Sequence, residues 1–392
     1  MILVFIFLIF LLFISLLLSK NNFFSPGVIT PGIWLICFCL FFILDHNLPS
    51  LSIKFLWALS LWVGCFCLFS NLFQIPKYSQ NNYKPSRFIR DLYFIVSILM
   101  FPSVLFFAYK AILLGDSGNW AMDLRLAALG KSKHFVVAYG GWHIFLWKAA
   151  YLIELMFISK RNKWRVVLLA LFYLVFGVLT MSKTILLDLI IITIVVLYFK
   201  EKIKAKYLLF SIIMVVFGFV WIQTLRHSIS INSDNSNEFL VIYALSSMSA
   251  FDTLIPLSTT SWGENTFRFF YEVFYKLGVF DIQPVSPILE WIIKPIATNT
   301  YTIMYPFYKD FGFKGILIVG SLFGILYGYL FKKSQQKSYV YQILYAVFIP
   351  FLLFQYVGET FLTNFLGNMV LIVLLFIPFW STKYKLFTKK HE

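Results

Sequence analysis

The chain of 392 residues is 60% hydrophobic and only 13% charged, and this composition excludes an ordinary water-soluble domain. Its net charge of +16 does not indicate a nucleic-acid partner, because the lysines and arginines gather in short connections between apolar runs. We therefore predict an all-α polytopic integral membrane protein that lies in the lipid bilayer and binds no nucleic acid.

Apolar runs near the ~20 residues that cross ~30 Å of hydrocarbon recur along the chain. The first run has neither a positively charged start nor an A-x-A cleavage site, so we expect a retained span rather than a cleaved signal peptide. Cys37, Cys39, Cys65 and Cys67 lie inside the runs, where we expect small buried side chains rather than a disulfide or a zinc site. We predict about eleven transmembrane helices, at residues 2–18, 28–44, 54–73, 91–113, 135–158, 166–181, 184–199, 207–224, 315–331, 339–357 and 361–380.

Basic residues occupy alternate connections between these spans. Most of the 33 lysines and arginines fall on one side, and the side that is rich in Lys and Arg is cytoplasmic. The C-terminus is then predicted inside and, with an odd number of spans, the N-terminus outside. The connection 114–134 departs from the trend, because its Arg125, Lys131 and Lys133 fall on the outer face.

This topology predicts three parts: spans 1–8 within residues 1–225, a large outer loop at 226–314, and spans 9–11 with a basic cytoplasmic tail at 315–392. A loop of that length is too long for a passive connection, so we expect function there. Three of its stretches have a helical pattern, and the aromatic side chains of the second suit a helix in the membrane interface or against the spans. These stretches are 238–254, 262–278 and 286–295, and the aromatic residues are Phe267, Phe270, Tyr271 and Phe274.

Signatures of soluble enzymes are missing: the sequence has no G-x-S-x-G, H-E-x-x-H, Walker loop or G-x-G-x-x-G. The cytoplasmic connections are also too short for an ATP-hydrolysing domain, so energy comes with the substrate or from a gradient. The chemistry then depends on ionisable residues near the outer leaflet. They are Arg125, Lys183, Asp188, Arg226, Arg268, Asp310 and Lys314.

The sequence leaves alternatives open at three places, two of them among these residues. Lys183 lies in an outer hairpin at the start of a helix, where its charge and the helix dipole would form an anion site. Alternatively, its side chain extends to the membrane interface, and Asp188 caps the helix or pairs with Lys183. Arg226 ends a span, either as an interfacial anchor or as a bidentate ligand of phosphate. Lys148 and Glu154 share one span, as a buried pair or as a proton pathway.

Several short stretches carry a resemblance to a known family. They are SPGVITPGIWLICFCLFFI at 25–43, the hairpin MSKT, Arg226 after its span, YALSSMSAFDTL at 243–254, and NTYTIMYPFYKDFGFKG at 299–315. With the layout of spans, they resemble the oligosaccharide repeat-unit polymerases of bacterial O-antigen and capsule loci. Lys183 stands where that family often has Arg, which keeps the charge but loses the bidentate geometry.

The resemblance implies a glycosyltransferase that needs neither a metal nor another cofactor and works on the outer face of the bacterial cytoplasmic membrane. Both substrates are oligosaccharides on undecaprenyl pyrophosphate, and the growing chain is transferred to the non-reducing end of a new repeat unit. A chain-length regulator and a flippase of the same pathway are the implied protein partners.

This chemistry assigns expected roles. Positive charge at the pyrophosphate stabilises the leaving group, and an attacking sugar hydroxyl needs at most one general base. Arg226 is the first choice for the pyrophosphate, supported by Lys183 and Arg268, with Arg125 as a further candidate. The base is His227 or Glu264, and Asp310 is either catalytic or a cap at the start of its span. The expected substrate-binding residues of the limb 299–315 are Asn299, Tyr301 and Tyr305, with Tyr308 beside them.

Two other functions share parts of this pattern. An O-antigen ligase-like glycosyltransferase would move finished polysaccharide onto a lipid acceptor with the same layout and chemistry. A lipid-linked oligosaccharide flippase or another transporter would place its charges in a cavity within the spans, whereas this sequence concentrates them in one outer loop.

Overall fold

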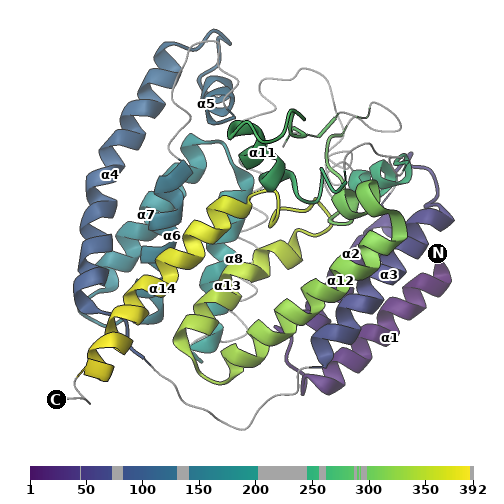
Figure 1. The fold of residues 1–392 in the computed structure, drawn as a ribbon, viewed down its shortest axis with the longest axis horizontal. Helices are drawn as coiled ribbons and strands as arrows, with labels where there is room; N and C mark the ends of the chain where they lie inside the picture. Colours follow the sequence, from purple (N-terminus) through teal and green to yellow (C-terminus); the bar gives the residue numbers. More distant parts are fainter. Residues whose placement is uncertain are drawn as a thin grey trace. The chain divides into compact units, whose positions relative to one another are not determined.

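A computed structural model describes residues 1–44, 46–72, 83–129, 141–201, 245–255, 262–286, 289–290, 292 and 298–388 (Figure 1). Within them, regular structure is helical apart from one antiparallel bridge between Ile292 and Thr298. The chain divides into two compact units. Unit 1 comprises Met1–Ser79, Asp234–Gln336 and Phe348–Asn368, and unit 2 comprises Gln80–Ser233, Lys337–Val347 and Met369–Glu392.

The helices follow the apolar runs of the sequence. In unit 1 they are α1 (Ile2–Leu18), α2 (Pro26–Ile43), α3 (Ile53–Asn71), α11 (Arg268–Lys276) and α12 (Tyr305–Gln335). In unit 2 they are α4 (Arg87–Leu113), α5 (Trp120–Ala128), α6 (Gly141–Met156), α7 (Lys163–Leu179) and α8 (Lys183–Phe199). Two more, α13 (Tyr339–Leu353) and α14 (Phe365–Thr388), contribute residues to both units.

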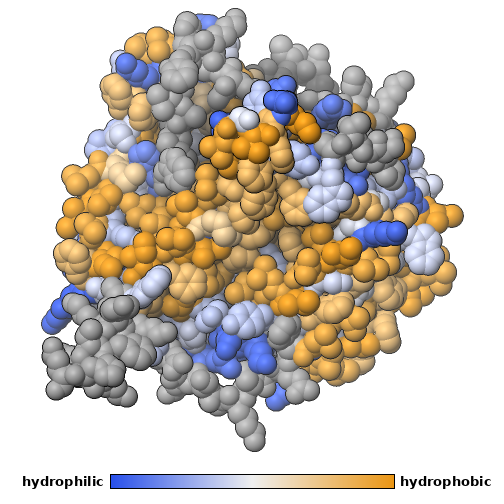
Figure 2. All heavy atoms as spheres, in the orientation of Figure 1, coloured by the Kyte–Doolittle hydropathy of each residue, from blue (hydrophilic) through white to orange (hydrophobic). Residues whose placement is uncertain are grey.

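Every predicted span except 207–224 coincides with a helix, and 207–224 lies outside the described residues. Four helices, α2, α3, α4 and α12, are long and apolar enough to cross a membrane, and α1, α13 and residues 365–380 form shorter apolar helices. Hydrophobic side chains dominate the visible face in Figure 2. The chain therefore has the helical, apolar character of a multi-pass membrane protein, while the number of spans stays a prediction.

The helices of unit 1 alternate in direction as spans should. α1 and α3 run parallel, because Phe7 lies against Gly64 and the Asn71 amide donates to the Ser15 hydroxyl at 2.9 Å. α2 runs the opposite way, since Gly27 near its start packs against Asn71 near the end of α3. Cys37 and Cys67 are buried, whereas Cys39 is exposed and Cys65 is half-buried, so the expectation of buried side chains was wrong for those two.

α12 runs parallel to α3, and the two lie side by side (Figure 1). Gly320 faces Trp62 and Gly324 faces Phe66, so the register advances in the same direction along both helices. A Cβ on Gly324 would lie 2.6 Å from the Phe66 carbonyl oxygen, which shows that the two backbones approach closely. Small residues at such a spacing are the usual way for membrane helices to pack.

Gln355 joins four parts of unit 1 from a fully buried position. Its Oε1 accepts hydrogen bonds from the indole N–H groups of Trp34 and Trp62, both at 3.0 Å. Its amide nitrogen donates to the Leu352 carbonyl at 2.9 Å, and its own carbonyl accepts from the Ile303 N–H at 2.8 Å. Each polar group of this side chain is therefore satisfied in an apolar environment.

The helices of unit 2 also alternate. α4 and α6 are antiparallel, because Arg90 pairs with Glu154 at one end and Ser103 contacts His143 at the other. Short connections join α6 to α7 and α7 to α8. α14 is antiparallel to α4 as well, since the Ser86 N–H donates to the Pro378 carbonyl at 2.8 Å and the Tyr93 hydroxyl to the Leu374 carbonyl at 2.9 Å.

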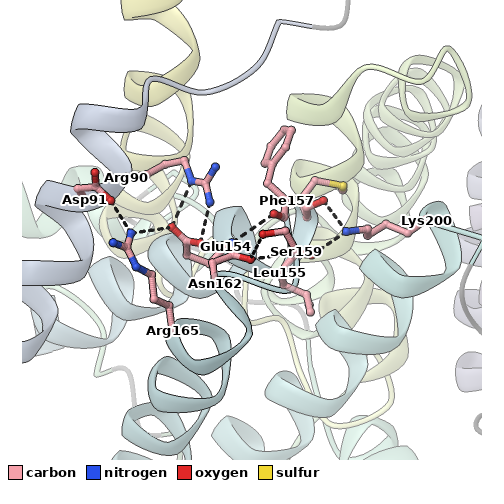
Figure 3. Close-up of polar contacts among 10 residues, drawn as sticks. Arg90, Asp91, Glu154, Leu155, Phe157, Ser159, Asn162, Arg165 and Lys200 are labelled. Carbon is pink, nitrogen blue, oxygen red and sulfur yellow. Dashed lines mark hydrogen bonds and ion pairs between the residues drawn. The ribbon is translucent and has the colours of Figure 1, made fainter.

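As a result, basic residues from four helices and their connections gather at one end of unit 2. Figure 3 shows the buried Glu154 carboxylate there, which accepts two hydrogen bonds from Arg90 and one from Asn162. Arg165 bridges Glu154, at 3.8 Å, and Asp91. Lys200 caps the end of α6 by donating to the Leu155 and Met156 carbonyls. The basic residues of this end are Arg87, Arg90, Lys160, Arg161, Lys163, Arg165 and Lys200.

One expectation about the connections was wrong, and one helix was not predicted. Residues 286–295 were expected to be helical, but their described members are not, and Ile292 pairs with Thr298 in the isolated bridge. The Ile292 N–H donates to the Thr298 carbonyl at 2.8 Å, and not to the carbonyl four residues earlier as in a helix. The connection 114–134 contains an unexpected helix, α5, which starts because the Asn119 side chain accepts the Ala121 N–H at 2.9 Å.

Candidate active site

The end of unit 1 at which α3 and α12 begin brings together the two stretches 243–254 and 299–315. Residues 245–252 are helical, and the Asp252 carboxylate accepts hydrogen bonds from the N–H, at 2.8 Å, and the hydroxyl of Ser52. Lys54 donates to the Asp252 and Leu254 carbonyls, the latter at 2.7 Å. The first stretch is thereby fixed to the start of α3.

Hydroxyl groups connect the first stretch to the segment that leads into the second. Ser246 donates to Thr298 at 3.1 Å, and the Thr298 and Thr300 hydroxyls lie 2.8 Å apart. The ring of Phe251 also packs on Tyr308 with centroids 5.1 Å apart. These contacts put two stretches that are about fifty residues apart in the sequence into one small structure.

Asp310 organises the neighbouring turn. Its carboxylate accepts hydrogen bonds from the Asn265 N–H at 3.3 Å, the Asn265 amide at 2.7 Å and the Thr266 N–H at 2.6 Å. The alternative of a cap at the start of its span finds no support in these hydrogen bonds, because all three come from residues 265 and 266. Asp310 instead holds the turn that precedes α11.

Gly312 interrupts α12 with φ +60° and ψ −145°, a backbone conformation that is open mainly to glycine. Residues 305–311 are therefore a short helix that precedes the long apolar part. The limb 299–315 expected from the sequence therefore includes a short helix, and its break lies at Gly312 just before the long apolar part.

The expected sugar-binding residues lie directly before and within this short helix. The rings of Tyr301 and Tyr305 have centroids 4.7 Å apart at an interplanar angle of 42°. Tyr301 is buried and donates its hydroxyl to the Glu290 carbonyl at 3.2 Å, and burial followed by the Glu290 charge raises its pKa. Asn299 and Tyr305 are half-buried and thus partly accessible.

Glu264 is half-buried in the same region. Burial raises the pKa of Tyr271, and the nearby carboxylates of Glu264 and Asp310 raise it further. The Tyr305 hydroxyl is likewise within electrostatic range of Glu264 and Asp310. One of the two candidate bases therefore lies among tyrosines at the end of unit 1 that also carries the expected sugar-binding residues.

Arg268, expected to support a pyrophosphate, is the first residue of α11 and has protein partners. Its Nε donates to the Val285 carbonyl at 2.6 Å, and its guanidinium lies 3.4 Å from Glu272. The hydrogen bond from Lys276 holds the pKa of Glu272 below its usual value. These contacts fix Arg268 against the segment that follows α11.

Two other expected cations, Lys183 and Arg125, lie together in unit 2. Lys183 is buried and is the first residue of α8, where the helix dipole adds positive charge. Arg125 of α5 donates to the Thr180 carbonyl of the same hairpin at 3.3 Å. Asp188, which one alternative paired with Lys183, forms an ion pair with Lys148 at 2.6 Å.

The remaining expectations concern Arg226, His227 and metal ligands. Arg226 and His227 lie outside the described residues. Among the residues that the structure does describe, no three His, Cys, Asp or Glu side chains gather closely enough to hold a metal ion.

Sequence reasoning did not single out Lys54 or Glu290, and it named Tyr271 only among the aromatic residues of 262–278; all three belong to this end of unit 1. A lysine in the first turn of an apolar span was a visible signal for Lys54, because such a charge needs a partner at the interface. The partners of Tyr271 and Glu290 depend on contacts between distant segments and left no sequence signal.

The geometry can be set beside comparisons with known proteins. A protein-family model described as "Putative O-antigen polymerase" matches residues 1–355. Searches of curated proteins and of solved structures each found no match. The matched region contains every element of the candidate site, from the start of α3 to the short helix before Gly312, and it spans most of the chain. The chain therefore belongs to the O-antigen polymerase family.

Proposed function

We propose that the protein joins oligosaccharide repeat units, carried on undecaprenyl pyrophosphate, at the outer face of the bacterial cytoplasmic membrane. The observation that carries this proposal is the family match over residues 1–355. The apolar helices support it, because a lipid-linked substrate requires an enzyme that meets the bilayer.

The reaction breaks the bond between the anomeric carbon of the growing chain and its lipid pyrophosphate. A hydroxyl at the non-reducing end of the incoming unit attacks that carbon, its proton passes to a base, and the lipid pyrophosphate leaves with the bonding electrons. The two needs are positive charge at the leaving group and a base at the acceptor.

We assign the leaving group to Arg226, with Lys183 and Arg125 as further cations. The contact of Arg125 with the hairpin that ends at Lys183 supports one anion site for those two, since the start of α8 adds its dipole there. Arg268 is a weaker candidate than the sequence indicated, because its guanidinium is bound to Val285 and Glu272.

Of the two bases, Glu264 has the better support, because it is half-buried near Tyr271 and Tyr305. His227 stays the alternative. Asp310 has a positioning role in this assignment, since its carboxylate holds the turn that carries Glu264. Asn299, Tyr301 and Tyr305 are assigned to the sugar rings, which stack on aromatic faces and bind amides.

The test is a gel of surface polysaccharide from a deletion strain complemented with wild type, Arg226→Ala, Arg226→Lys or Glu264→Gln. We expect the deletion to leave single repeat units on the final acceptor. Arg226→Ala and Glu264→Gln should fail to restore the ladder at normal protein level, since one transition-state contact contributes about 10²–10³-fold in rate. Arg226→Lys should restore part of it, because the charge remains.

The same gel distinguishes the rival functions. Loss of a ligase would leave long chains on the carrier lipid, and loss of a flippase would leave single units on the cytoplasmic face. A ladder that survives the deletion would contradict the proposal. The flippase and the chain-length regulator of the pathway are the partners we propose for the assembled system.

A further inference from the structure

Helix α11 presents an apolar stripe that the described part of the chain covers only in part, by Phe365 at Phe270 and by Phe280 at Phe274. None of its residues is buried, and Phe270, Phe274 and Leu277 follow one another at helical spacing with 45%, 38% and 68% of their surface exposed. The chain after the helix continues in the same character, since Val279 and Ile282 are exposed as well. In water, such a surface would be unfavourable for an outer loop.

The opposite stripe of α11 is charged. Arg268, Glu272 and Lys276 are four residues apart and form two ion pairs along the helix, at 3.4 Å and 2.8 Å. This division into a charged and an apolar side is the pattern of a helix that lies in the plane of a membrane surface. Figure 2 shows hydrophobic side chains at the position of α11, with hydrophilic ones beside them.

The level of α11 relative to the apolar helices of unit 1 is fixed by ring contacts. Phe269 and Phe270 pack on Phe365, the first residue of α14, with centroids 5.2 Å and 5.8 Å apart. Before α11, Trp262 is 71% exposed and contacts Phe311 at the break of α12, at 5.3 Å. α11 thus lies where two apolar helices begin, which is the level of the lipid headgroups for helices that span the bilayer.

We infer that α11 and the segment to Ile282 lie in the lipid surface, with Phe270, Phe274 and Leu277 among the acyl chains and the charged stripe toward water. Continuity with the apolar helices at Phe365 and Phe311 favours lipid over a soluble partner, because the ends of bilayer-spanning helices lie at the headgroup level next to the acyl chains. The leaflet is the outer one if the proposed orientation holds, and the immersion does not depend on catalytic activity.

Spin labels at three positions test this inference. The four native cysteines are changed to alanine, a single cysteine replaces Phe274, Leu277 or Lys276, and each protein is checked for monodisperse behaviour before labelling. The labelled proteins are placed in nanodiscs of phosphatidylethanolamine and phosphatidylglycerol. Collision rates are then measured with oxygen, which concentrates in lipid, and with a water-soluble nickel chelate.

We expect the labels at Phe274→Cys and Leu277→Cys to collide with oxygen several-fold more often than with nickel, and the label at Lys276→Cys to show the reverse. Equal and high nickel collision at all three positions would overturn the inference, because the stripe would then face water. Exclusion of both reagents at the apolar positions would overturn it too, since protein, from this chain or a second copy, would cover the stripe. None of these readings requires polymerase activity, so failure of the proposed function would leave them unchanged.

Discussion

The Gln355 carboxamide accepts both the Trp34 and the Trp62 indole N–H groups inside unit 1. Gln355→Leu would leave both donors buried without a partner, and each such loss costs about 1–3 kcal/mol. We predict that this variant lowers the free energy of unfolding by about 2–4 kcal/mol, measured by titration with SDS in mixed micelles. Gln336→Leu, at the half-exposed end of α12, is the control and should change it little. An equal effect of the two substitutions would refute this account of Gln355.

Lys148 and Asp188 form an ion pair between α6 and α8, and Tyr173 of α7 donates a further hydrogen bond to the same carboxylate. Both side chains are largely buried, so removing one charge leaves the other without compensation. We predict that Asp188→Ala destabilises unit 2 by about 3–5 kcal/mol in the same SDS titration.

The double variant Lys148→Met with Asp188→Leu provides the matched comparison. It removes both charges and keeps the volume, so it should recover most of the stability that Asp188→Ala loses. If the double variant is as unstable as the single one, the ion pair is not the cause, and packing at these positions decides the stability.

Sequence reasoning identified most of the buried ionisable residues of the apolar runs but not their partners. It considered Lys148 with Glu154, and Lys183 with Asp188, because each pair shares a helix at short spacing. The structure pairs Lys148 with Asp188 and Glu154 with Arg90, across neighbouring helices. Periodicity describes which residues share a face of one helix, whereas these partners depend on which helices pack together.

Gly312 separates the short helix that carries Asp310 from the long apolar part of α12. A side chain at φ +60° and ψ −145° is strained, and such strain costs about 1–3 kcal/mol. A Cβ at this position meets no atom within 4 Å, so the backbone conformation alone accounts for the expected loss.

We therefore predict that Gly312→Ala lowers the unfolding temperature and shortens the polysaccharide ladder, since the turn held by Asp310 would shift. Gly32→Ala is the control, because a Cβ there also meets nothing within 4 Å and Gly32 lies inside α2 without a positive φ. The measurement is thermal unfolding in detergent beside the gel. A normal ladder and temperature for Gly312→Ala would contradict the role given to the break.

The seam between α3 and α12 depends on small residues. A Cβ on Gly324 would lie 2.6 Å from the Phe66 carbonyl oxygen, whereas on Gly320 the nearest atoms belong to Trp62, at 3.3 Å. We predict that Gly324→Ala costs about 1–3 kcal/mol, because backbone atoms must move, and that Gly320→Ala costs less. Thermal unfolding compares the two, and the reverse order would show that this register is wrong.

The apolar runs were sufficient to locate the helices, and they did so within a few residues at most ends. They could not locate α5, whose nine residues are too few for a span, or the short helix at 305–311 before the break at Gly312, which is too short and too polar to belong to an apolar run. The pattern at 286–295 misled because Ile292 pairs with Thr298, and apolar periodicity does not show such a contact. The candidate site was predicted least well, because it consists of contacts between segments that only the fold brings together.

Within each unit, the directions of the helices agree with the predicted alternation of spans, and in unit 2 the basic connections lie at one end. In unit 1, α1, α3 and α12 run one way and α2 the other; in unit 2, α4 and α7 run opposite to α6, α8 and α14. These directions are those of the predicted alternation of spans. The end of unit 2 that holds the Glu154 network also holds the start of α4 and the end of α14, so the basic connections and the C-terminal helix share one side of that unit.

This arrangement predicts the orientation of the protein, because a cluster of arginines and lysines at helix ends stays in the cytoplasm. Fusions after residues 116 and 280 should give active alkaline phosphatase, which folds only outside. Fusions of green fluorescent protein after residue 161 and at the C-terminus should fluoresce, because this reporter becomes fluorescent only in the cytoplasm. Phosphatase activity both after residue 161 and at the C-terminus would show that the orientation is the reverse of the predicted one. Glu264 would then lie in the cytoplasm, which would exclude a reaction at the outer face. Different sides for residue 161 and the C-terminus would instead contradict the shared direction of α6 and α14, on which the packing of unit 2 depends.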